Sequence, residues 1–264
     1  MDEANAALFL ALPRRPGLAY PGEADGRISV VRATVAQTKV SVTKFSELNY
    51  AFNVHWARAR NARRLGEPIA HFAMQHDDIR PAACWADVLI REGQQWGADV
   101  VSAVVPLKDD RGLTSTGIRN ARTGDVRRLT MTELFHLPET FGVKDLIAAG
   151  IDVDGDLQDK LLVANTGLWI CRFDVPWVSE FTGFCDQNSI VTMPSGEIAA
   201  AKLSEDWIFS EWCWRQGIRV MATRKVAVGH VEYPTEPSGH GNREFRNDSV
   251  WGCWQTDLGD ELNA

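Results

Sequence analysis

The sequence predicts an α/β fold with a mostly parallel central sheet, on three observations. Residues 7–12 (ALFLAL) and 98–106 (ADVVSAVVP) are almost continuous apolar runs, which is the pattern of strands buried on both faces. Strand and helix patterns alternate through the first half of the chain, as they do in an α/β sandwich. A content of 45% hydrophobic and 24% charged residues over 264 residues is typical of a folded protein and excludes a disordered or fibrous chain.

The first half of the chain predicts its elements in a regular order. After the strand at 7–12, residues 13–26 hold three Pro and three Gly and predict a loop. Residues 28–42 alternate Val, Ala and Thr with polar residues and predict one or two strands. Apolar residues then recur at helical spacing from Leu48, so we expect a helix capped by Ser46 and ended by Gly66. A strand over 69–74, a helix over 82–96 and a strand over 98–106 complete this half.

The second half is less regular. Residues 108–128 are rich in Gly, Thr, Arg and Asp and predict a long functional or mobile loop, and residues 187–196 predict another loop. A helix is expected over 205–215, because its apolar residues share one face and Gly217 follows it. The other expected elements are short strands over 161–163, 168–172, 218–221 and 226–231, and a flexible tail or lid from residue 234.

Charge and cysteine usage limit the classes of function. With 28 Lys+Arg against 35 Asp+Glu, the net charge of −7 argues against a dedicated nucleic-acid coat. Arginines at 58–64 and 119–128 could still form a local surface for a polyanion. Residues 6–12 are too short to span a bilayer and follow acidic residues, so we expect no signal peptide and no membrane insertion. The five scattered cysteines have no metal-ligand spacing, which predicts reduced thiols and a cytoplasmic protein.

Three polar clusters are candidates for chemistry. His76, Asp77 and Asp78 directly follow the strand at 69–74, and polar groups at such a strand end are where α/β sheets bind ligands. Adjacent carboxylates need a neutralising cation, and oxygen ligands suit Mg²⁺ or Mn²⁺. Glu205 and Asp206 begin the second-half helix, where the helix dipole favours anions. The third cluster is His230, within the strand at 226–231. Taken singly, these features are equally consistent with a solvated turn, an N-terminal charge and a packed histidine.

In order along the chain, these segments resemble the GT-A glycosyltransferases. Residues 59–61 (ARN) followed by His76-Asp77-Asp78 resemble the tract and the DxD-type metal motif of that superfamily. Glu205-Asp206 resembles its ED motif, and His230 falls where many members carry a downstream metal-binding histidine. The resemblance covers residues 45–232 and is closest to the family-2-like branch. It implies a GT-A type, Rossmann-like three-layer sandwich. The whole chain would be one domain: a nucleotide-sugar-binding half at 1–110, an acceptor and catalytic half at 111–233, and the tail or lid at 234–264.

The resemblance also implies roles for the acidic clusters. Asp78 would bind Mn²⁺ or Mg²⁺ on the donor diphosphate, with Asp77 near the ribose or the metal. His230 would complete the metal site. His76 stands where the first acid of the motif is usual and brings no negative charge, which puts ordinary metal binding at that position in doubt. Asp206 would be the general base of an inverting reaction.

Further residues would bind the two substrates. Glu205 would support the base or the acceptor. Pro13 and Arg14 follow the first strand and are candidates for the nucleotide base, and Arg60 and Asn61 for the nucleotide or sugar. The loop at 108–116 could line the sugar site. The ten Trp against three Tyr suggest a further role: Trp207 follows the proposed base and offers an indole face to an acceptor sugar, whereas Trp56, Trp85, Trp96 and Trp212 lie at helix positions where we expect core packing.

The sequence thus predicts a metal-dependent glycosyltransferase that moves a sugar from a nucleotide-sugar, with UDP as the carrier by resemblance, to an acceptor hydroxyl. Retention of configuration stays open. Two alternatives remain: a nucleotidyltransferase-like enzyme, although a Gly-rich basic phosphate loop is not evident at residues 13–17, or a non-catalytic nucleotide-sugar-binding protein of the same fold. The acceptor is undetermined, and a modified nucleic-acid base is a minority alternative to a protein, glycan, lipid or small molecule.

Overall fold

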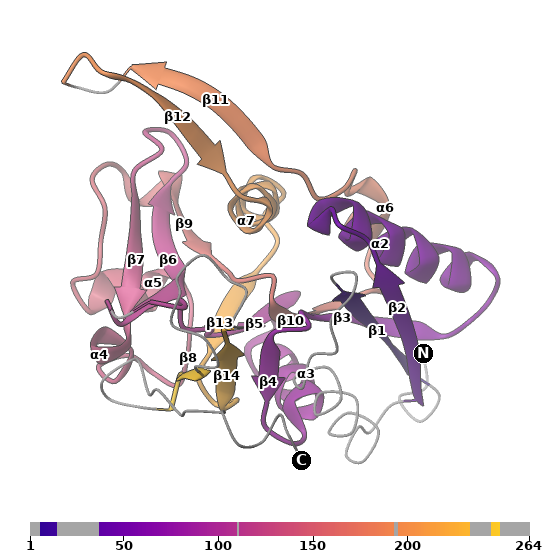
Figure 1. Ribbon diagram of the computed structural model, residues 1–264. Helices are drawn as coiled ribbons and strands as arrows, with labels where there is room; N and C mark the ends of the chain where they lie inside the picture. Colours follow the sequence, from indigo (N-terminus) through magenta and orange to yellow (C-terminus); the bar gives the residue numbers. More distant parts are fainter. Residues whose placement is uncertain (1–5, 15–36, 110, 193–194, 233–243, 249–264) are drawn as a thin grey trace.

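A seven-stranded mixed sheet forms the centre of the molecule (Figure 1). The structure is a computed structural model that describes residues 6–14, 37–109, 111–192, 195–232 and 244–248. In spatial order the strands are β2 (Gln37–Lys44), β1 (Ala7–Arg14), β3 (Ile69–Gln75), β10 (Leu168–Arg172), β5 (Val100–Ala103), β13 (Val220–Thr223) and β8 (Thr140–Phe141). Only β10 and β8 run against the other strands of this sheet. The prediction of an α/β fold is therefore confirmed, whereas the sheet is mixed: the pairs β2–β1, β1–β3 and β5–β13 are parallel, and the other three pairs are antiparallel.

Strand β1 is buried on both faces, as its apolar sequence predicts. Phe9 and its alternate neighbours pack with helices α2 (Leu48–Arg64), α6 (Trp177–Glu180) and α7 (Glu205–Arg215). Leu10 and its alternate neighbours pack with helix α3 (Trp85–Trp96) on the other face. Because side chains alternate across a strand, helices on both faces require a strand that is apolar throughout.

The predicted helices form, with corrections at their ends. Helix α7 has the predicted bounds. Helix α2 is preceded by Glu47 as its N-cap, which makes no side-chain capping bond, so the prediction of Ser46 as the cap is wrong. Helix α3 begins at Trp85, three residues later than predicted, because Cys84 before it has a left-handed backbone (φ 62°). The remaining helices are short: α4 (Met131–Leu134), α5 (Val143–Ala148) and the 3-10 turn η2 (Leu157–Asp159).

Two predicted loops are strands. Within residues 108–128 lie β6 (Leu113–Asn120) and part of β7 (Val126–Thr130), which form a three-stranded sheet with β9 (Lys160–Val163). Gly117 permits the close approach of β6 to β7, since a Cβ there would lie 2.6 Å from the Arg127 carbonyl oxygen. Within residues 187–196 lies β11 (Gln187–Thr192), which pairs with β12 (Ile198–Leu203) in a hairpin that extends from the rest of the molecule at the top of Figure 1. Its strands are largely exposed and lack the apolar pattern from which strands are predicted.

A third small sheet joins β4 (Ile79–Pro81), β14 (Val228–Val231) and β15 (Glu244–Arg246). Strand β15 and residues 247–248 lie in the predicted tail, and the rest of that tail is outside the described residues. Residues 15–36, which cover most of the first predicted loop and part of the strand pattern after it, are also outside them. Trp56 and Trp85 are buried as predicted, whereas Trp96 is 37% exposed. Among the described helices, none combines the length and the apolar character needed to cross a membrane.

Candidate functional site

Two clusters of charged side chains lie at the sheet edge where the parallel strands end. The first belongs to the turn between β3 and β4, which contains His76, Asp77 and Asp78. The second belongs to the start of α7. Because α7 leads back to the beginning of β13, its first turn, with Glu205 and Asp206, lies toward the end of that strand. Ligands of α/β proteins bind at this edge, so the sheet brings both predicted clusters to the expected place.

Backbone hydrogen bonds hold the turn that carries Asp78. The amide of His76 donates to the carbonyl of Gly167 (2.8 Å), which ties the end of β3 to the segment before β10. The amide of Val231 donates to the carbonyl of Asp78 (2.8 Å), next to the pairing of β14 with β4. His230 thereby reaches Asp78, although the two residues are 152 positions apart in the sequence.

The carboxylate of Asp78 is surrounded by nitrogen groups. The ammonium of Lys108 lies 2.7 Å from its Oδ2, and Nε2 of His230 lies 3.3 Å from the same atom. Nδ1 of His230 lies 2.8 Å from the carbonyl oxygen of Pro106, which can only accept, so this nitrogen carries a proton. Burial alone would raise the pKa of Asp78, but His230, Lys108 and His76 together hold it well below its usual value. Asp78 is therefore ionised at neutral pH, and the nitrogen groups around it stabilise its charge.

The start of α7 carries two carboxyl groups with different partners. Oδ1 of Asp206 accepts hydrogen bonds from the hydroxyl of Ser204 and from the backbone amide of Trp207 (2.9 Å for the latter). Oε1 of Glu205 accepts a hydrogen bond from the hydroxyl of Thr166 (3.1 Å). Asp206 is 8% exposed, so its carboxyl group is largely removed from water.

Burial raises the pKa of both carboxyl groups, and neighbouring carboxyl groups raise that of Glu205 further. Burial, and then the charge of Asp206, raise the pKa of Glu205 to about 7. Burial also raises the pKa of Asp206, against the opposing influence of Ser204 and Arg128. Asp186 makes a side-chain hydrogen bond with Glu205, and the ammonium of Lys202 lies 2.6 Å from Asp186. The helix dipole, which the sequence argument invoked for Asp206, is thus outweighed by burial, and Glu205 is the group that titrates near neutral pH.

A single turn links the two clusters. Residues 165–167 connect β9 to β10. The sequence predicts one strand before and one strand after these residues but gives the residues themselves no role. The carbonyl of Gly167 holds His76, while the hydroxyl of Thr166 holds Glu205. The carbonyl of Asn165 accepts a hydrogen bond from the hydroxyl of Ser102 on β5 (2.7 Å). Both clusters therefore contact one turn that is anchored in the central sheet.

Arg128 joins the second cluster from strand β7. Its guanidinium lies 5.1 Å from the ring centroid of Trp207, within the range of a cation–π interaction. Burial lowers the pKa of Arg128, and the nearby charge of Asp206 partly offsets this. Two other arginines of the expected basic surface are neutralised by carboxylates: Arg119 pairs with Glu211, and Arg127 pairs with Glu133.

The predicted nucleotide-binding residues divide into two groups. Pro13 and Arg14 end β1, whose Ala11 is paired with Met74 of the parallel strand β3. They therefore reach the same sheet edge as His76. Of the loop proposed to line the sugar site, Ser115 already donates its hydroxyl to the carbonyl of Val105 (2.9 Å).

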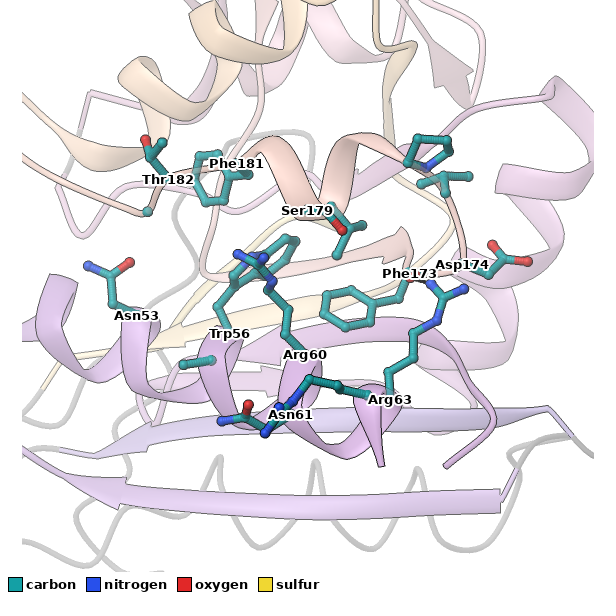
Figure 2. A pocket seen from close by; sticks show the side chains of 16 residues that line it. Asn53, Trp56, Arg60, Asn61, Arg63, Phe173, Asp174, Ser179, Phe181 and Thr182 are labelled. Atoms are coloured by element: carbon teal, nitrogen blue, oxygen red, sulfur yellow. Dashed lines mark hydrogen bonds between the residues drawn. The ribbon is translucent and has the colours of Figure 1, made fainter. Parts of the chain in front are cut away.

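Arg60 and Asn61 belong to a different region. Helix α2 starts after the end of β2 and finishes before the start of β3, so its last turns lie at the opposite edge of the sheet from Asp78. There both residues line a cavity of about 740 Å³ between α2 and the segment around α6 (Figure 2). The structure therefore does not bring Arg60 and Asn61 to the acidic clusters.

The donor atoms around Asp78 do not form a resident metal site. Within the described residues, no group of three or more His, Cys, Asp or Glu side chains is arranged to hold a metal ion. Oδ2 of Asp78 is already approached by Lys108 and His230, and only Oδ1 is buried without a hydrogen-bond partner in the described part of the chain. The need for Mn²⁺ or Mg²⁺ therefore stays a prediction from the resemblance, and these residues as arranged do not fit it.

Sequence reasoning gave no role to Thr166 or Asp186, and it placed Lys108 only in a loop that could line the sugar site and Arg128 only in a basic surface for a polyanion. Their only signals were weak ones, a polar loop after a central strand and polar residues between two short strands. Each reaches its partner through contacts distant in sequence, which spacing along the chain does not reveal.

Comparisons with known proteins give no family. No family model matches the sequence, and no curated protein matches it. Among solved structures, protein A197 from STIV is similar over 92% of this chain and 90% of its own, with 11% identity and a TM-score of 0.49. The uridine diphosphate N-acetylglucosamine pyrophosphorylase from Trypanosoma brucei is similar over 62% of this chain, with 15% identity and a TM-score of 0.27, and this chain spans only 31% of it. Neither likeness is strong enough to carry a fold or a function to this chain.

Proposed function

We propose that this chain is a glycosyltransferase that takes a sugar from a nucleotide-sugar, with UDP as the carrier that the sequence resemblance implies, and transfers it to an acceptor hydroxyl. One observation carries the proposal. The Asp78–Lys108–His230 cluster and the Glu205–Asp206 pair face the same edge of an α/β sheet and are joined through one turn. Transfer of a sugar needs these two kinds of group, a cationic one for the leaving diphosphate and a carboxylate for the acceptor proton.

The reaction breaks the bond between the sugar carbon and the phosphate oxygen, and the electron pair of that bond stays on the diphosphate. A new bond forms between the sugar carbon and the acceptor oxygen. The acceptor proton passes to a carboxylate, for which we propose Asp206. Glu205, with a pKa of about 7, holds a proton for part of the time at neutral pH and so relieves the repulsion between the two acids. General base catalysis of this kind contributes about 10²–10⁴-fold.

A panel of nucleoside diphosphates and nucleotide-sugars, each with and without Mn²⁺, tests the proposal by thermal shift. The ligands that stabilise the protein are then incubated with it, and release of nucleoside diphosphate is measured. We expect slow hydrolysis of the sugar donor. Asp78→Asn and Asp206→Asn should each reduce it by at least about tenfold, or about 1.4 kcal/mol. The exposed Asp125→Asn serves as the matched control.

Three results would contradict parts of the proposal. A donor that binds but releases no diphosphate would indicate the non-catalytic binding protein. Exchange of pyrophosphate into the donor would indicate the nucleotidyltransferase. If none of the compounds stabilises the protein, the proposal that it binds a nucleotide-sugar is rejected. Binding of a polyanionic acceptor that weakens steeply with added salt would support the nucleic-acid alternative for the acceptor, and a flat response would reject it.

A further inference from the structure

The first acidic cluster already contains a cation of its own. The ammonium group of Lys108 lies 2.7 Å from Oδ2 of Asp78, a distance at which a charge-assisted hydrogen bond forms. The two side chains are only 14% and 9% exposed. By contrast, the ion pair of Lys39 with Glu67 is 46% and 40% exposed. Solvent screens the Lys108–Asp78 pair much less, so its position is strongly determined.

The backbone around Lys108 is also held in place. The adjacent amide of Leu107 donates to the carbonyl of Leu113 (2.8 Å), and Pro106 forms a β-bridge with Thr114. The carbonyl of Pro106 in turn orients the imidazole of His230, whose Nε2 lies 3.3 Å from the same oxygen of Asp78. One short segment after β5 therefore positions both nitrogen groups at the carboxylate. A lysine that served only solubility would not need this arrangement.

We infer that Lys108 takes the place of a divalent cation and binds the diphosphate of the donor. This inference rests on the proposed function of the same site. An ammonium group has three N–H donors, so it can donate to a carboxylate and to a phosphate oxygen at the same time. Asp78 is then a positioning residue, since it acts by orienting Lys108 and His230 at the end of β3.

The chemistry balances without a metal. When the bond from the sugar carbon to the phosphate oxygen breaks, the diphosphate gains the electron pair, and its added negative charge faces the ammonium of Lys108. Lys108 keeps its proton throughout, because the acceptor proton goes to the carboxylate on α7. A fixed positive charge in a partly dehydrated site stabilises such a leaving group without reorganisation.

Calorimetric titration with UDP in EDTA, and again in MnCl₂, tests the inference on the full chain. Where another nucleoside diphosphate stabilises the protein more in the thermal-shift panel, that compound replaces UDP. We expect the wild-type protein to bind in EDTA, with less than a threefold gain in affinity from Mn²⁺. Lys108→Ala should weaken binding in EDTA by at least about tenfold, or about 1.4 kcal/mol. Mn²⁺ should restore much of this loss, since removal of the ammonium leaves Oδ2 of Asp78, with Nε2 of His230 beside it, open to an ion.

Two further variants control for folding. Lys108→Arg keeps the charge and should bind in EDTA within about threefold of wild type even if the alanine variant fails to fold. Lys225→Ala removes a lysine that lies 2.7 Å from Glu92, outside the two clusters, and should leave binding unchanged.

Each contrary result points to a different failure. If wild type binds the diphosphate only in MnCl₂, or if Lys108→Ala binds in EDTA as well as wild type, the inference is overturned and the proposed glycosyltransferase function stands. If no nucleoside diphosphate binds in either buffer, both the inference and the proposed function fail.

Discussion

The two acidic clusters have opposite electrostatics although they belong to one site. Around Asp78, the side chains of His230, Lys108 and His76 hold the pKa of the carboxyl group well below its usual value. Around Glu205, carboxyl groups crowd together, and its pKa rises to about 7. The single turn at 165–167 contacts both.

This difference separates two tasks within one sheet edge. A cluster that contains a largely buried ammonium suits a group that leaves as an anion, and a carboxyl pair with raised pKa values suits proton transfer near neutral pH. Stability should follow the same division. The low pKa of Asp78 makes its ionised form stabilising, whereas the raised pKa of Glu205 makes its ionised form destabilising. The four predictions below test this contrast.

Asp78→Asn should have the largest effect on stability. It leaves the ammonium of Lys108 without its counter-charge, and we expect a loss of about 3 kcal/mol in the free energy of unfolding at pH 7. Because the folded pKa is depressed, the stabilisation is fully present above the unfolded pKa near 4 and is lost progressively as the pH falls from there through the depressed folded pKa. Urea unfolding at pH 7 and at a series of pH values below 4 should therefore show a difference from wild type that shrinks as the pH falls. Asp125→Asn is the control, and a constant difference would contradict the proposed charge compensation.

Glu205→Gln should change the free energy of unfolding in the opposite direction and stabilise the protein. The folded-state pKa of about 7 lies above the unfolded value of 4.5, so wild-type stability falls as the pH rises from about 4.5 to about 7. The variant has no charge to bury and should be more stable than wild type by about 1–2 kcal/mol at pH 8, and by little at pH 5. Urea unfolding at the two pH values measures this gain. The exposed Glu197→Gln should change stability equally at both pH values, and a loss of stability in Glu205→Gln at pH 8 would refute the assignment.

Trp207→Ala should separate donor chemistry from acceptor use. Trp207 follows Asp206, the proposed base, and its indole lies under Arg128, so its removal should reduce transfer to a panel of sugar acceptors by about tenfold, the effect of losing a stacking platform. Donor hydrolysis should fall by less than threefold. The ratio of the two initial rates is the measurement, with Trp96→Ala as the control. An equal loss of both rates would assign Trp207 to structure alone.

Arg60→Ala should have the smallest effect. The arginine lines the cavity at the opposite sheet edge, far along α2 from the acidic clusters. Donor hydrolysis should stay within about twofold of wild type, as for most surface substitutions. A rise of more than tenfold in the KM for the donor would favour the sequence prediction that Arg60 binds the nucleotide-sugar.

The sequence was most informative where a residue's role depends on its near neighbours. The helix over 205–215 and the strand ends before His76 and after β1 follow from local patterning, and they place Asp78, Glu205, Asp206 and Pro13 at the edge where the parallel strands end. The sequence predicts loops where β6 and β11 lie, because polar Thr, Ser and Arg residues stabilise a strand only once its partner strand is present.

The sequence by itself determined the α/β class, the burial of β1 on both faces and the presence of acids at the ends of β3 and before α7. Only the tertiary structure decided that Lys108 lies against Asp78, that Thr166 and Asp186 contact Glu205, and that Arg60 faces another cavity. The physical reason is that hydrophobic periodicity is read within a few residues of chain. The charge that neutralises a buried carboxylate, in contrast, arrives from strands and loops that become neighbours only when the sheet has formed.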